Sequence, residues 1–186
     1  MQKLKIGYIS FAKTSFDMDI SAESRRKALG LLQKLNNVEV VDAGRLITLE
    51  TEAYEVVKMF KEKQVDAVVL HYCSFCLGAM TPAVVANLNL PVVLLATPEV
   101  NFEGNRVRSN SFCALNLNSF TLYSMKKKYR YIFKPLDDTT ILQDFRVIFT
   151  ALHTIKRLKS VRVGLIGSRS PGFYTSNKKL VDASLS

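Results

Sequence analysis

The chain has 186 residues, 48% of them hydrophobic, which is enough to bury the core of one domain and excludes a globally disordered protein. No apolar run reaches the roughly 18 residues that a membrane helix needs, and the start MQKLKIGYIS does not look like a signal peptide. The net charge of +10 raises nucleic acid as a partner, but the basic residues are scattered, so we expect a solvated lysine-rich surface and no nucleic-acid binding.

Strand-like and helix-like patterns alternate along the chain. Strands are predicted where β-branched and other apolar residues cluster, at 3–10, 38–44, 65–73, 91–98, 129–136 and 162–168. Helices are predicted from helically spaced apolar residues at 21–35, 51–63, 82–88, 111–127 and 140–158. Ser21 is the expected N-cap of the first helix, and Gly44 the expected end of the second strand. This alternation favours an α/β fold: a doubly wound, flavodoxin-like, mainly parallel sheet with helices on both faces.

Sheets of this type bind ligands beyond the carboxyl ends of their strands, where the strand order reverses. Four loops begin at such strand ends, at residues 11–17, 72–78, 97–108 and 168–174. All four are richer in polar, glycine or proline residues than the strands before them. We therefore expect a ligand site among these loops.

Cys73 and Cys76 form a C-x-x-C motif where a strand is predicted to turn into a helix. A helix N-terminus can lower a thiol pKa, which would suit a redox pair, and a zinc site would need two further ligands from Cys113, His71 or His153. No Trp precedes the motif and no Pro lies inside it, so small residues lining a packed turn are favoured. We also interpret His71 as a core residue, and the odd cysteine count as that of a cytoplasmic protein.

Two polar runs remain after this assignment. The run from Lys13 to Asp17 lacks the glycines of a phosphate-binding loop. It could hold an anion through Lys13 and the hydroxyl groups, or simply begin a helix. A second run places Arg106 and Arg108 before a Ser-Asn-Ser sequence, and neither solvation nor helix capping explains the whole of it.

Five stretches together resemble the N-terminal region of L-fucose isomerase and related L-arabinose isomerase-like proteins: TSFDMDIS, YCSFCLGAM, ATPE, RVRSNSFCALNLNSF and VGLIGSRSPGFY. The resemblance implies a longer, three-domain aldose–ketose isomerase that works through an enediol, with a divalent metal, usually Mn2+. In the family the metal ligands lie in later domains, so we expect no catalytic residue and no metal ligand in this chain. The implied division is an N-terminal α/β domain at 1–160, and the first strand and start of a second domain at 161–186.

The family's first domain contributes subunit packing and one wall of a neighbouring subunit's active site. The implied partners are therefore further copies of the chain, as a trimer or hexamer, and a sugar. Lys13 stands where fucose isomerases have an Arg-Pro-Thr stretch, Phe75 matches a Trp that packs on the sugar, and Pro171 falls where another side chain approaches it. These three residues are the predicted substrate contacts. The alternative is a non-enzymatic module that binds a small ligand in the same crevice.

Overall fold

The computed structural model describes residues 3–99 and 106–162 and shows strands and helices in strict alternation. The elements are β1 (Leu4–Phe11), α1 (Met18–Gln33), β2 (Val38–Ile47), α2 (Glu50–Glu62), β3 (Ala67–Tyr72), α3 (Met80–Leu88), β4 (Val92–Ala96), α4 (Ser111–Ser124), β5 (Tyr129–Phe133) and α5 (Ile141–Lys159). The expected strand at 162–168 falls, from residue 163 onwards, outside the described residues.

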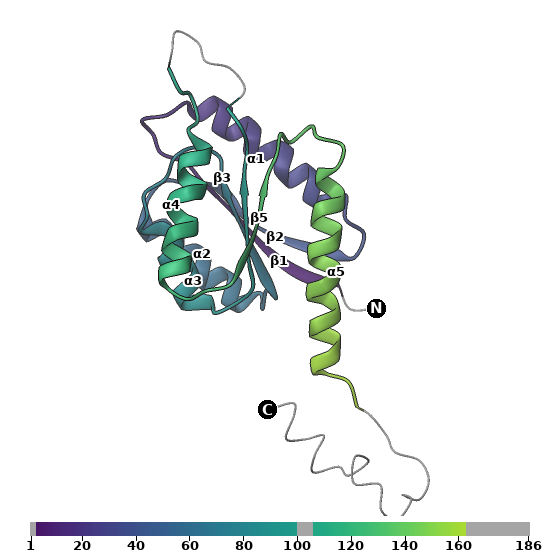
Figure 1. The fold of residues 1–186 in the computed structure, drawn as a ribbon. Coiled ribbons are helices and arrows are strands. Elements are labelled where there is room, and N and C mark those ends of the chain that lie inside the picture. Colours follow the sequence, from purple (N-terminus) through teal and green to yellow (C-terminus); the bar gives the residue numbers. More distant parts are fainter. Residues whose placement is uncertain (1–2, 100–105, 163–186) are drawn as a thin grey trace, which may run out of the picture.

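The strands form one five-stranded sheet in the order β2-β1-β3-β4-β5, and every neighbouring pair is parallel. Helices α1 and α5 cover one face, and α2, α3 and α4 cover the other (Figure 1). This order is that of flavodoxin-like folds. The predicted α/β doubly wound class is confirmed.

The central strand β3 shows why the chain folds this way. Its sequence AVVLHY is buried at every position, as expected for a strand with helices on both faces. Val68, Leu70 and Tyr72 point toward α2, α3 and α4, whereas Ala67 and Val69 point toward α1 and α5. Alternate residues thus feed two separate cores.

Two expected boundaries are wrong. Helix α1 begins at Met18, and its N-cap is Asp17, whose side chain accepts a hydrogen bond from the Ile20 N–H; Ser21 lies inside the helix. Strand β2 continues past Gly44 to Ile47, because Gly44 has φ +83 and the pairing of β1 with β2 shifts register near it. A glycine with positive φ can absorb such an irregularity without ending a strand.

Residues 3–99 and 106–162 contain no helix with the length and apolar content that crossing a membrane requires.

Candidate functional site

The site is the crevice at the carboxyl ends of β1, β3 and β4. The order of connection along the sheet reverses between β1 and β3, so the loops that follow these two strands diverge there. Backbone hydrogen bonds tie these loops to the one after β4: Cys73 N–H donates to Phe11 O (3.0 Å) and Phe75 N–H donates to Ser109 O (2.7 Å). The Lys13 N–H also donates to Ser74 Oγ at 3.1 Å. The three loops therefore form one connected rim.

Lys13 and Phe75 meet on this rim. The Lys13 Nζ lies 5.6 Å from the centre of the Phe75 ring, within range of a cation–π contact. Phe75 is half-buried, and its ring centre is 5.9 Å from that of Phe16 on the β1 loop. Two of the predicted substrate contacts, Lys13 and Phe75, therefore lie next to each other, whereas their contact with a sugar stays a prediction. Pro171, the third predicted contact, lies outside the described residues.

Asp17 and Arg108 join the β1 loop to the β4 loop. The Arg108 guanidinium donates to one Asp17 carboxylate oxygen through Nη2 (2.5 Å) and Nε (3.2 Å), and the Asp17 N–H donates to the Arg108 carbonyl (3.1 Å). The hydrogen bond from the Ile20 N–H, followed by that from Arg108, lowers the pKa of Asp17. Asp17 thus caps α1 and anchors a loop that is remote in sequence.

Glu99 is the functional-loop residue that sequence reasoning missed. Its carboxylate accepts hydrogen bonds from the backbone N–H groups of Arg108, Ser109 and Asn110, at 2.9 Å each, and from the Ser109 hydroxyl at 2.7 Å. Burial raises the pKa of Glu99, but these four donors outweigh burial and the net shift is downward. Among the side chains of the polar run, Glu99 explains Ser109, whose hydroxyl it binds, and its place in ATPE, just before that run, was the available signal.

A polar pocket of ≈ 370 Å³ opens beside the Phe75 ring. Its described walls come from the β1 loop, with Thr14, Ser15 and Phe16, and from Arg106 and Arg108 across the crevice. Phe16 lines this pocket and also neighbours the Phe75 ring, so Phe16 forms the wall between the pocket and that ring.

The cysteine motif packs as a closed turn. Cys73 and Cys76 are unpaired and buried. Burial raises the pKa of both thiols, that of Cys76 to about 12, so neither is a reactive thiolate near neutral pH. The buried thiols therefore give no support to a redox pair. They agree with the interpretation that small residues line a packed turn here.

His71 lies in a buried polar network beneath α1. Its Nδ1 is 2.7 Å from the Tyr8 hydroxyl and 3.4 Å from Cys73 Sγ, and its Nε2 is 3.3 Å from Ser24 Oγ. Burial, followed by the Arg25 charge, lowers the pKa of His71 to about 3. The ring is neutral and hydrogen-bonded, so the interpretation of His71 as a satisfied core histidine is confirmed.

A metal ion does not fit the described part of the chain. Within residues 3–99 and 106–162 no group of three or more His, Cys, Asp or Glu side chains is placed to hold one. The expectation that Mn2+ is bound by later domains stays a prediction.

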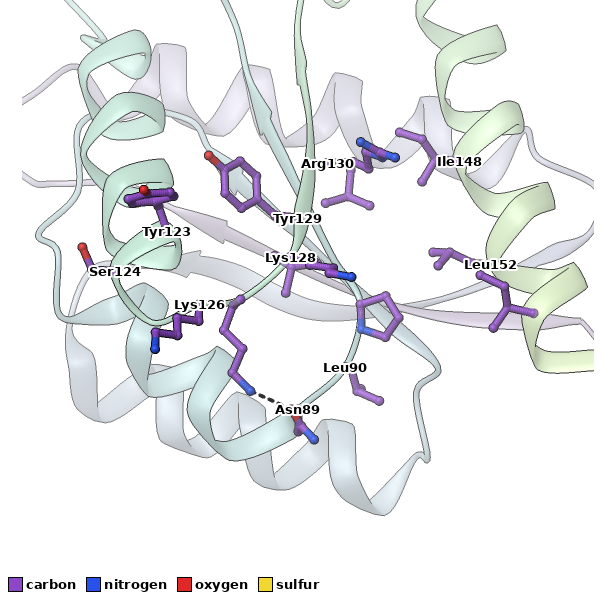
Figure 2. A pocket seen from close by; sticks show the side chains of 15 residues that line it. Asn89, Leu90, Tyr123, Ser124, Lys126, Lys128, Tyr129, Arg130, Ile148 and Leu152 are labelled. Carbon is purple, nitrogen blue, oxygen red and sulfur yellow. Dashed lines mark hydrogen bonds between the residues drawn. The ribbon is translucent and has the colours of Figure 1, made fainter. Parts of the chain in front are cut away.

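A second, larger hollow lies at the opposite end of the sheet. It has a volume of ≈ 1050 Å³ and sits where β4 and β5 begin, between the end of α4 and the face of α5. Figure 2 shows Tyr123, Tyr129, Ile148 and Leu152 around it. Lys127 and Asn89 also line it and are joined by a hydrogen bond of 2.7 Å from the Lys127 Nζ. It is far from the strand ends that define the candidate site, so we do not assign it to that site.

The chain folds as a doubly wound α/β domain with a crevice at the carboxyl ends of its strands. The chain belongs to the family described as fucose/sulfoquinovose isomerase, N-terminal domain, whose profile matches residues 7–159. The resemblance found in the sequence is thereby confirmed.

Curated relatives with similar sequences are named sulfoquinovose isomerases. A sulfoquinovose isomerase from Alkalicoccus urumqiensis is 32% identical over 113 residues, which is 60% of this chain and 25% of the relative. Sulfoquinovose isomerases from Priestia aryabhattai and Priestia megaterium are each 22% identical over 176 residues, 95% of this chain and 39% of the relative. The chain therefore spans well under half the length of the curated relatives it matches.

Proposed function

We propose that this chain is the N-terminal domain of a metal-dependent aldose–ketose isomerase, and that it supplies one wall of a neighbouring subunit's active site. The observation that carries the proposal is the Lys13–Phe75 pair at the crevice. A half-buried aromatic ring suits the apolar C–H face of a sugar, and an ammonium beside it suits a hydroxyl. Family membership supplies the class of substrate, and the names of the relatives point to sulfoquinovose.

In this reaction a proton moves between the two carbons of an aldose that become the carbonyl and hydroxyl carbons of the ketose. A divalent metal, if bound by later domains, would supply Lewis-acid stabilisation of charge on the sugar oxygens; no cluster among the described residues of this chain could hold it. This chain's share is to position the sugar. Phe75 forms a platform, Lys13 donates to a hydroxyl, and the loop fixed by Glu99 holds the opposite wall. Such positioning lowers the entropic cost of reaching the reactive geometry.

Subunit packing is the second half of the proposal, and helix α4 supports it. Its sequence SFCALNLNSFTLYS contains no charged residue, although one side of the helix faces solvent. Phe112, Phe120 and Tyr123 on that side are 55%, 67% and 76% exposed. An uncharged surface with large exposed aromatic groups is typical of a protein interface. We propose that copies of the protein meet there, in the trimer or hexamer of the family.

The test is a subunit-mixing experiment with the full-length polypeptide. One variant carries Phe75→Ala, and a second carries a substitution in the metal site of the later domains. If the wall is supplied in trans, each variant alone is nearly inactive and mixed oligomers regain part of the activity with Mn2+. Activity that does not return on mixing, although mixed oligomers form, would show that Phe75 acts within its own subunit or not at all.

The rival function is a non-enzymatic module that binds a small ligand in the same crevice. The fixed loop and the polar pocket suit that function equally well. Calorimetry and turnover with the full-length protein separate the two. Sugar binding without isomerisation, at saturating Mn2+, would favour the binding module.

A further inference from the structure

We propose that the large hollow at the start of β4 and β5 is a docking surface inside the full-length protein, and that it receives an acidic amphipathic helix from the later part of the same polypeptide. This inference rests on the proposed function, because it takes the chain to be the N-terminal domain of a longer protein. The hollow has a volume of ≈ 1050 Å³ and lies at the opposite end of the strands from the crevice.

The first support is an apolar wall on one side of the hollow. Ile148, Leu152 and Ile155 of α5 line it at intervals of four and three residues, which places them along one side of the helix. Figure 2 shows Ile148 and Leu152 pointing from α5 into the hollow. Leu90 and Pro91, just before β4, add further apolar surface. A stripe with this spacing is the surface through which one helix packs against another.

The second support is the length of α5. Ile141, Phe145 and Phe149, which face the sheet, are at most 4% exposed, whereas Ile155 and Leu158 near the end of the helix are 51% and 65% exposed. Helix α5 has 19 residues, about 28 Å, and the neighbouring strand β5 has 5, about 17 Å. The end of α5 therefore extends past the sheet (Figure 1). A second helix lying along α5 would cover the apolar residues that the described part of the chain leaves exposed.

The third support is a group of cations at the rim. Lys126, Lys128 and Arg130 line the hollow, and no described Asp or Glu does so. Within the part of the chain that the structure describes, none of these three side chains takes part in a hydrogen bond or an ion pair. By contrast, Lys134 on the loop after β5 is paired with Asp144. A partner that carries carboxylates beside its apolar side chains therefore complements the hollow in charge and in polarity.

The fourth support is the strained turn that holds the rim. Lys126 has φ +55, a left-handed conformation that favours glycine. The turn ends α4, because the Lys126 and Lys127 N–H groups donate to Tyr123 O and Leu122 O, at 2.9 Å each. The Lys127 Nζ also donates to Asn89 Oδ1 at the end of α3, at 2.7 Å. A lysine where glycine would be less strained points to a role for its side chain.

The source of the helix follows from where α5 ends. The chain leaves α5 at the same end of the sheet as the hollow, so any segment that follows is tethered beside it at a high effective concentration. The chain matches 39% of the Priestia relatives, so most of a protein of that length lies outside it. Residues 163–186 contain three cations and one acidic residue, Asp182, and do not complement the rim in charge. We therefore assign the docking helix to the polypeptide past Ser186.

The main experiment compares the acetylation of lysines in the full-length protein and in the 186-residue chain, measured by mass spectrometry. Lys126 and Lys128 should react about tenfold more slowly in the full-length protein, because the docked helix must open locally before the reagent reaches them. Lys58, which is exposed on α2, is the control and should react equally in both. Equal rates at Lys126 and Lys128 would overturn the inference.

Cross-linking identifies the occupant. A carbodiimide joins a lysine directly to a carboxylate that it contacts. In oligomers assembled from isotopically light and heavy subunits, links from Lys126 or Lys128 to a carboxylate past Ser186 should join peptides of one isotope only. Links between light and heavy peptides would show that a neighbouring subunit fills the hollow. They would overturn the inference and join the hollow to the contact proposed at α4, with which it shares Tyr123.

A substitution at Lys126 separates docking from a purely structural role of the turn. Lys126→Gly relieves the left-handed strain, so it should raise the urea midpoint of the 186-residue chain. In the full-length protein the same change removes one charge from the rim, and the acetylation rate of Lys128 should rise about threefold or more. Lys126→Arg keeps the charge and should leave that rate unchanged. A Lys128 rate that Lys126→Gly does not move would overturn the acidic occupant.

Isomerase activity is an independent measurement on the same protein. Full-length protein that isomerises no sugar, but in which Lys126 and Lys128 are protected, would count against the proposed function and keep the docking surface. An active isomerase with both lysines unprotected would overturn the docking surface and leave the function standing.

Discussion

The two faces of the sheet are built differently. On the face covered by α2, α3 and α4 the core is mostly aliphatic and aromatic, with Phe60, Val84 and Leu94 completely buried. On the face covered by α1 and α5 the apolar core gives way, toward the crevice, to the network of Tyr8, His71 and their polar neighbours. The face of α2, α3 and α4 also holds buried polar contacts, between Tyr72 and Thr81 (2.9 Å) and between Asn118 and Cys76 (3.6 Å). The other face places its network directly beneath the helix that borders the site.

The difference suggests a division of labour. Apolar burial contributes most of the stability of a domain and is not directional. Buried hydrogen bonds contribute less net free energy, but they demand fixed geometry. The polar face therefore holds α1, and with it Asp17, in one orientation at the crevice, whereas the apolar face holds the sheet together. Four experiments test this comparison.

The largest effect is expected on the apolar face. Phe60 on α2 is completely buried against β1, so Phe60→Ala removes a large ring and leaves a cavity. We expect a loss of about 3 to 5 kcal/mol in the free energy of unfolding, measured by urea titration. Val147→Ala, on the exposed side of α5, is the control and should change stability by less than about 0.5 kcal/mol. Equal effects at both positions would contradict the assignment of the core.

A substitution at Gly7 tests how closely the core on the same face is packed. A Cβ at this position would lie 2.7 to 3.0 Å from three ring carbons of Phe60, whose ring is buried and cannot move away. Gly7→Ala should therefore destabilise the chain by about 1 to 3 kcal/mol. In the Phe60→Leu background the same change should cost less, because the clash is removed. An equal cost in both backgrounds would show that Phe60 is not the obstacle.

The polar face should be sensitive to pH. The folded-state pKa of His71, about 3, lies below the unfolded value of about 6.5, so between these values only the unfolded state binds the proton. Stability should therefore fall as pH falls, by about 2 kcal/mol from pH 7 to pH 5. His71→Gln should remove this dependence in urea titrations, whereas His153→Gln should keep it. A wild-type stability that does not change over this range would show that His71 is not held neutral.

The smallest effect is expected from one hydroxyl of the network. Tyr8→Phe keeps the ring but removes the 2.7 Å contact with His71 Nδ1, which leaves a buried ring nitrogen poorly paired. We expect a loss of about 1 to 2 kcal/mol. Tyr54→Phe removes an exposed hydroxyl that donates to Glu50, and should change stability by less than about 0.5 kcal/mol. If both changes lowered the free energy of unfolding equally, the buried hydroxyl would contribute no more to stability than the exposed one.

The sequence was sufficient for the elements that rest on repeated local patterns. The mostly apolar run of β3 and the alternation of strands with amphipathic helices predict a parallel sheet without further information, and the structure agrees. Boundaries set by single residues were less predictable. Gly44 is read from sequence as a strand end, but its left-handed conformation lets β2 continue, and only the pairing partner β1 reveals this.

The location of the candidate site could be predicted from the sequence, but the hydrogen bonds within the site could not. Lys13 and Phe75 follow neighbouring strands, so their proximity could be inferred from the fold class. The pairing of Asp17 with Arg108 spans 91 positions, and no local pattern connects residues so far apart. The four bonds of Glu99 were hidden for another reason: a loop carboxylate in sequence is usually solvated, and only the folded loop shows what it accepts.

The placement of α5 has a consequence for the handedness of the chain. Helices α2, α3 and α4 carry the chain across the sheet toward β5 on one face, whereas α5 returns on the face of α1 (Figure 1). Parallel crossovers are right-handed in about 98% of cases. A strand joined to β5 through α5 and added beyond it would make a left-handed crossover. The topology therefore disfavours a parallel sixth strand that reaches the outer edge of β5 through α5, and this edge is available to an antiparallel strand or to another chain.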